Sequence, residues 1–124
     1  MSATRHLAAF AVALALVSAS CSTALAQKKY DTGASDTEIK IGQTMPYSGP
    51  VSAFGALGKG EAGYFRMLNE RGGINGRKVN LISLDNAFSP PKAIEQTRKL
   101  IDDDGVLAEV GTVGTVPNVA VQKY

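Results

Sequence analysis

The chain has 124 residues, a formal net charge of +2 at pH 7 and 44% hydrophobic residues, which suits one small globular domain. Its basic residues are scattered, so the composition indicates neither a nucleic-acid-binding protein nor one that coats an anionic membrane. The only cysteine and the only histidine, Cys21 and His6, precede the predicted mature chain, which excludes disulfides and His or Cys metal sites from it.

The first 26 residues have the pattern of an export signal. A basic start is followed by an unbroken apolar run over residues 7–17, and Ala24-Leu25-Ala26 forms an A-x-A cleavage site. The run is shorter than the roughly 20 residues that span a bilayer. We predict a signal peptide over 1–26, cleavage after Ala26 and a periplasmic mature protein. The alternatives are a lipoprotein acylated at Cys21 and a buried N-terminal helix.

Residues 27–37 are polar and predict a flexible lead-in. The apolar run over 39–45 predicts a strand, which Pro46 ends because proline cannot donate to a sheet ladder. Apolar residues at three- and four-residue spacing then predict a helix over 53–71. The face expected to be buried consists of Ala56, Leu57, Gly60, Tyr64, Met67 and Leu68.

The second half of the chain repeats this alternation. The predicted elements are a strand over 79–84, a helix from Pro90 to about Gly105, a strand over 106–110, an exit loop over 111–118 and a helix from Val119. Ser89 is the expected N-cap of the first of these helices. The order β-α-β-α-β-(α) predicts an α/β fold with a parallel sheet and right-handed crossovers.

Three strand-exit loops are expected at one edge of this sheet, where α/β proteins bind ligands. Helices begin there with unpaired amide groups and the positive end of a dipole, which suit a carboxylate. The candidate ligand-binding residues are Tyr47, Ser48, Gly49, Asp85, Phe88, Thr112, Gly114 and Thr115. The hydroxyls and amides would bind the carboxylate of a ligand, and Asp85 would bind its ammonium group. The aromatic residues would contact an apolar side chain, so the set suits an amino acid.

Each candidate also has a structural interpretation. Ser48 would cap a turn, Asp85 would hydrogen-bond its own loop, the aromatics would lie in the core, and Thr112 and Thr115 would be strand formers at a strand end. The convergence of the loops carries more weight than any single residue.

The sequence gives little indication of an active site, a cofactor site or a metal site. Residues 58–63 match G-x-G-x-x-G with Asp85 following, but they lie a dozen residues beyond the first strand and inside a helix, so we expect close helix packing instead of dinucleotide binding. Ser48 has no histidine to activate it, and Asp102-Asp103-Asp104 reads as a solvated helix end. We predict no enzyme, no cofactor and no metal.

The chain resembles the periplasmic substrate-binding proteins of ABC transporters, in the branched-chain amino acid receptor family. The matching segments are Ile39-Lys40-Ile41-Gly42, Tyr47-Ser48-Gly49-Pro50, Gly72-Gly73-Ile74-Asn75-Gly76-Arg77, Ser89-Pro90-Pro91-Lys92-Ala93, Gly111-Thr112-Val113-Gly114-Thr115, Asn118 and the run from Val119 to Tyr124. The resemblance covers nearly all of the predicted mature chain, and the Gly-Gly-Ile-Asn-Gly-Arg run is its most specific piece.

The resemblance implies a type I, three-layer α/β/α fold in a two-lobed protein that closes on a small carboxylate or amide and delivers it to an ABC permease. The site carried over by position comprises the Ser48 region, 85–88 and 112–115. Val116-Pro117 departs from the hydroxyl residue that the family commonly has there. The family is several times longer, so residues 38–124 are expected to be part of lobe one, in a fragment that binds poorly alone. The alternatives are a ligand-sensing receptor domain and, less favoured, an exported α/β enzyme.

Overall fold

The computed structural model describes residues 29–124. The predicted signal peptide, with its cleavage site and Cys21, lies outside the described residues, and the predicted lead-in is described from residue 29. The lead-in contacts the first strand, because the carbonyl of Gly33 accepts a hydrogen bond from the amide of Lys40 at 2.7 Å.

In the described part of the chain, no helix has the length and hydrophobicity needed to cross a membrane.

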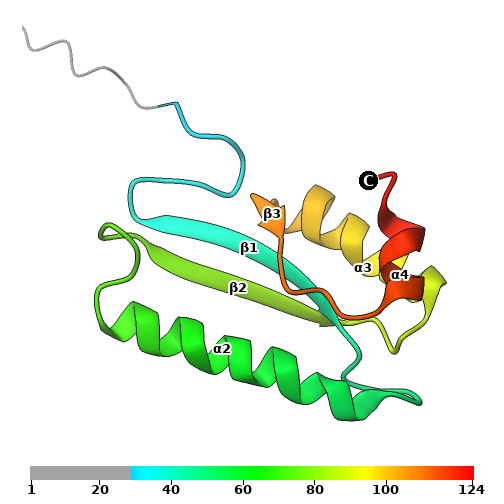
Figure 1. Cartoon of the computed structure of the whole chain (residues 1–124). Coiled ribbons are helices and arrows are strands. Elements are labelled where there is room, and N and C mark those ends of the chain that lie inside the picture. Colours follow the sequence, from blue (N-terminus) through cyan, green and yellow to red (C-terminus); the bar gives the residue numbers. More distant parts are fainter. Residues whose placement is uncertain (1–28) are drawn as a thin grey trace, which may run out of the picture.

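A parallel three-stranded sheet forms the centre of the molecule (Figure 1). Strand β1, Glu38–Met45, lies between β2, Lys78–Asp85, and β3, Ala108–Glu109. β1 and β2 pair over their whole length, which puts Met45 opposite Asp85. The loops that leave these two strands therefore start side by side.

Helices cover both faces of the sheet, as Figure 1 shows. Helix α2, Gly55–Glu70, follows a 3-10 turn, Ser52–Phe54, and lies on one face. Helices α3, Pro90–Arg98, and α4, Thr115–Val121, lie together on the other, and α3 continues as a π-helical turn, Lys99–Asp103. The predicted three-layer α/β fold with a parallel sheet is confirmed.

Local sequence explains where the long helices begin and end. Pro90 and Pro91 occupy the first turn of α3, where no intrahelical partner exists for the missing N–H groups. Past the end of α2, Gly72 has a φ of 101° and the amide of Gly73 donates to the carbonyl of Leu68 at 3.0 Å. This glycine-dependent hydrogen bond closes the helix.

Two elements in the last part of the chain differ from the prediction. The strand expected over 106–110 is limited to β3, because it pairs only at Ile41 and Gly42 of β1. The helix expected from Val119 begins earlier, at Thr115. Pro117 fits this start because the first turn of a helix leaves its N–H groups unpaired.

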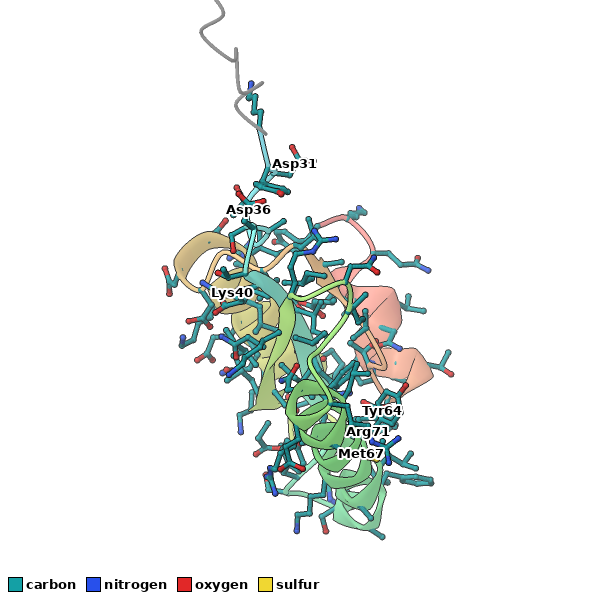
Figure 2. All side chains as sticks on the ribbon, turned by 90° about the vertical axis from the view of Figure 1, so that its left-hand side faces the viewer. Asp31, Asp36, Lys40, Tyr64, Met67 and Arg71 are labelled. Atoms are coloured by element: carbon teal, nitrogen blue, oxygen red, sulfur yellow. The ribbon has the colours of Figure 1, made fainter. Side chains whose placement is uncertain are left out.

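The buried face of α2 also differs from the prediction. Leu57 and Tyr64 are 51% and 55% exposed, whereas Gly55 and Gly58 are buried. Figure 2 shows Tyr64 and Met67 together on one side of the helix. Helical spacing identified an apolar stripe, but α2 packs through its glycines because residues without a Cβ let a helix approach its neighbour closely.

The central strand is the most deeply buried element. Met45 is fully buried, as are Ala93 and Leu100 on the α3 side. Two polar residues of the same strand, Gln43 and Thr44, are 0% and 1% exposed. Buried polar side chains need hydrogen-bond partners, so their surroundings bear directly on the loops above them.

Candidate functional site

The first and second strand-exit loops are joined by Ser48 and Asp85. The Ser48 hydroxyl donates to one carboxylate oxygen of Asp85 at 2.5 Å, and its amide donates to the other at 3.1 Å. This contact connects residues 37 positions apart, and it follows from the pairing of Met45 with Asp85 at the strand ends. The two loops are therefore held together at the edge of the sheet.

Asp85 has further partners within the second loop and α3. The amide of Ala87 and the ammonium group of Lys92 each donate to its carboxylate at 2.9 Å. Partial burial raises the pKa of Asp85, but hydrogen bonds from the Ser48 hydroxyl, Lys92 and the two amides outweigh it and hold the pKa well below its usual range.

This arrangement bears on the role predicted for Asp85. Its carboxylate accepts four hydrogen bonds from the protein, so it fastens the first loop to the second and to α3. Contact of the same carboxylate with a ligand ammonium stays a prediction.

Close backbone approaches bring all three loops together. A Cβ added at Gly49, in the first loop, would lie 2.6 Å from the carbonyl oxygen of Ala87 in the second. A Cβ added at Gly114, in the third loop, would lie 2.6 Å from the ring of Phe88. Ala87 and Phe88 have φ angles of 49° and 58°, a conformation that costs free energy in residues with a side chain. The predicted convergence of the loops is therefore present in the structure.

Tyr47 lies at the start of the first loop but turns toward α2. Its hydroxyl is 2.6 Å from the hydroxyl of Ser83, and its side chain is close to Gly55 and Gly58. These contacts match the alternative in which Tyr47 packs in the core. Its contact with a ligand stays a prediction.

The third loop presents the remaining candidates. Thr112 is half-buried, and its carbonyl accepts a hydrogen bond from the side-chain amide of Asn118 at 3.3 Å. Thr115 is exposed and begins α4, after Gly114 with a φ of 114°. Thr115, in the third loop, and Ser48, in the first, are thus both exposed at the edge of the sheet where the strands end.

An aromatic residue absent from the predicted site lies at the same edge. Phe54 is 53% exposed and ends the 3-10 turn between the first loop and α2. Phe54 falls at the start of the helix predicted over 53–71, and the prediction assigns it no role in the site. The available signal was an aromatic residue directly before a helix that begins at the sheet edge.

The loop edge has no metal-binding cluster among the described residues, and a separate hollow lies beside it. Within residues 29–124, no group of three His, Cys, Asp or Glu side chains lies close enough to hold a metal ion. A hollow of about 540 Å³ lies to the side, between α3, β3 and α4, and reaches Thr112. The edge carries the exposed Thr115 hydroxyl and the half-exposed Phe54 ring, groups that can contact a small molecule non-covalently.

Comparison with known proteins gives consistent matches. The family model described as "Periplasmic binding protein" matches residues 38–124. Leu/Ile/Val-binding protein homolog 3 of Brucella melitensis is 37% identical over 79 residues, which cover 63% of this chain and 21% of that protein. The chain spans about a fifth of the length of the curated relatives it matches.

Solved structures are similar over most of the described residues. A branched-chain amino acid transporter substrate binding protein of Streptococcus pneumoniae, in complex with isoleucine, has a TM-score of 0.65 and 29% identity, covering 68% of this chain and 25% of that one. A fatty acid ABC transporter substrate-binding protein of Thermomonospora curvata has a TM-score of 0.67 and 25% identity, covering 77% and 24%. These two proteins are named for different ligands, although they share the fold.

Proposed function

The chain belongs to the periplasmic binding protein family, and on that basis we propose that it is part of the solute receptor of an ABC importer. The proposed ligand is a branched-chain amino acid or a similar small carboxylate or amide. The ligand would bind in a cleft between two lobes, with residues 38–124 supplying one wall, and would be delivered to a membrane permease.

The meeting of the three strand-exit loops carries this proposal. Ser48 and Asp85 join the first two loops, and Phe88 and Gly114 bring the second against the third. Ser48 and Thr115 are both exposed at this edge. The Ser48 hydroxyl gives its single proton to Asp85, so Thr115 is the hydroxyl that we expect to donate to a ligand carboxylate. Among the relatives, the Brucella protein is named for leucine, isoleucine and valine, which favours this ligand class.

The ligand ammonium needs a partner besides Asp85. The Asp85 carboxylate already accepts four hydrogen bonds, one of them from a lysine. We therefore assign recognition of the ammonium group mainly to the opposite wall of the cleft. For the same reason we expect residues 27–124 by themselves to bind weakly.

Export and location belong to the same proposal. The mature protein would lie in the periplasm after cleavage behind Ala26. An intact mass of the protein in a periplasmic extract, captured with antibody raised against residues 29–124, tests this. A product that retains residues 1–26 would contradict the proposed cleavage.

Ligand binding is tested by calorimetric titration of the captured native protein with isoleucine, leucine and valine. We expect saturable binding at one site per chain. Replacement Thr115→Val keeps the side-chain shape but removes the hydroxyl, and should weaken binding by about tenfold or more, since hydrogen bonds to charged groups contribute about 1.5–3 kcal/mol. The matched Thr115→Ser keeps the hydroxyl and should retain most of the affinity. Equal affinities in the two variants would remove Thr115 from the site, and turnover of a bound amino acid would favour an enzyme.

A further inference from the structure

A buried chain of hydrogen bonds runs beneath the loops, across β1 and β2. Ser83, on β2, donates from its hydroxyl to the side-chain carbonyl of Gln43 at 2.8 Å. Because that hydroxyl has a single proton, the Tyr47 hydroxyl is the donor in its 2.6 Å contact with Ser83. The base of the first loop is thus connected to the centre of the sheet.

Gln43 continues the chain toward α2 and the third loop. Its side-chain NH₂ donates to the carboxylate of Glu61 and, at 3.3 Å, to the backbone carbonyl of Gly111. Both acceptors lie on the nitrogen side and the single donor on the oxygen side, so the surroundings decide the orientation of the amide. All the hydrogen-bonding groups of Gln43 are accounted for, although the residue is 0% exposed.

Gly111 is packed closely against the side chains of Gln43 and Glu61. Gly111 has a φ of 63°, and a Cβ there would lie 2.8 Å from the Gln43 nitrogen and 2.7 Å from a Glu61 oxygen. Gly111 lies near the start of the loop that carries Thr112 and Gly114 and leads to Thr115. A change in the position of the Gln43 amide would therefore move the start of that loop.

The stability of the fold does not by itself require a polar residue at position 43. Replacing both partners of a buried hydrogen bond by apolar groups of the same shape is often nearly neutral, whereas one unmatched partner is costly. Gln43 is tied to the first loop through Ser83 and Tyr47 and to the third loop through Gly111. It is the point at which the positions of the first and third loops become linked.

We propose that Gln43 is a positioning residue that sets the third loop relative to the first by holding the Gly111 carbonyl, with no contact to the ligand itself. This rests on the proposed function only in that these loops bind the solute. The linkage between the loops is a property of the chain without ligand and can be measured as such.

Amide hydrogen exchange on the full chain, without ligand, tests the linkage. The reporters are the amides of Val110 and Asn118, which donate to the carbonyls of Gly42 and Gly114. The reference is the amide of Leu107, directly before β3, which donates to the carbonyl of Lys40. Gln43→Met keeps a similar length and volume but cannot hold Gly111. We expect exchange at the reporters to rise about tenfold, the effect of losing one or two hydrogen bonds, with Leu107 changed much less.

Two more variants make the outcome decisive. Glu61→Ala leaves β1 intact and should raise exchange at Val110 by a smaller factor, because Gln43 keeps the Gly111 carbonyl. Asn80→Ala is the matched control, since it removes another side-chain amide, one that donates to Glu38 at 3.3 Å. It should leave Val110 unchanged. Equal acceleration at Val110 and Leu107, or none at either, would overturn the proposal.

Isoleucine titration of wild-type and Gln43→Met native protein separates the two proposals. Wild-type protein that binds no amino acid would contradict the proposed function, while the exchange result would still decide the role of Gln43. If the wild type binds, the variant should bind more weakly although no ligand contact has been removed. Unchanged affinity would count against a positioning role.

Discussion

Three glycines of α2 allow the effect of close packing on stability to be distinguished from the effect of helix propensity. Gly60 and Gly63 have no atoms within 4 Å of an added Cβ. At Gly58 an added Cβ would lie 2.4 Å from the Tyr47 hydroxyl oxygen and 2.9 Å from Cγ of Met45. Each of these glycines is replaced by alanine in a separate variant.

The expected magnitudes follow from these distances. In a helix interior alanine is favoured over glycine by about 1 kcal/mol, so Gly60→Ala and Gly63→Ala should each stabilise the chain by about that amount. Gly58→Ala gains the same term but overpacks a buried site, which costs about 1–3 kcal/mol. Displacing the Tyr47 hydroxyl from Ser83 costs about 1 kcal/mol more. The net result is a loss of about 1–3 kcal/mol at Gly58.

Urea unfolding followed by circular dichroism at pH 7 measures these differences. The midpoint should rise for Gly60→Ala and Gly63→Ala and fall for Gly58→Ala. A double variant, Gly58→Ala with Tyr47→Phe, removes the closest clashing atom and should recover part of the loss. If Gly58→Ala raised the midpoint as much as Gly60→Ala, the packing of Tyr47 against α2 would be refuted.

Three further variants, with Lys99→Gln as a surface control, test the loop edge and the charges around it. Asp85→Asn should lower the free energy of unfolding at pH 7 by about 2 kcal/mol. This is less than the sum for separate charged hydrogen bonds, because the ion pair with Lys92 is partly exposed. Lys99→Gln, at the surface, should change the free energy of unfolding by less than about 0.5 kcal/mol. Since the folded pKa of Asp85 is lowered, its contribution is complete above the unfolded pKa of about 3.9 and is lost as the pH falls toward the folded pKa, so urea unfolding across that range should show wild type and Asp85→Asn converging. Gly114→Ala places a Cβ 2.6 Å from the Phe88 ring at a φ of 114°, and should destabilise the chain by at least about 1 kcal/mol; a neutral result would mean that the second and third loops are not in contact. Burial raises the pKa of Glu109, so its carboxylate opposes folding at neutral pH; Glu109→Gln should raise the urea midpoint at pH 7, and the gain should disappear below the unfolded pKa of about 4.3.

The order of elements and the family were predictable from the sequence. The first strand was expected over 39–45 and is observed as Glu38–Met45, and α3 begins at Pro90 as expected. These signals are local, since apolar runs, prolines and paired glycines act on their own segment of backbone. The resemblance to periplasmic binding proteins is confirmed by the family model over residues 38–124.

The packing of α2 was not predictable from the same signals. Periodicity selected the stripe that includes Leu57 and Tyr64, yet both are more than half exposed. The expectation that the G-x-G-x-x-G glycines serve close packing holds for Gly58 and is wrong for Gly60 and Gly63, which face open space. Which face of a helix is buried depends on the shape of the partner surface, and that surface is assembled from distant residues.

By itself, the sequence determined the alternation of strands and helices and the expectation that three loops meet at one edge, because backbone conformation and the handedness of crossovers follow from local and general rules. Only the tertiary structure decided what those loops contact. The pairing of Met45 with Asp85 brings Ser48 within hydrogen-bond distance of a carboxylate 37 residues away, and Gln43 reaches a glycine carbonyl 68 residues away. Such partners depend on strand register and on the distance between layers, which no local pattern in the chain encodes.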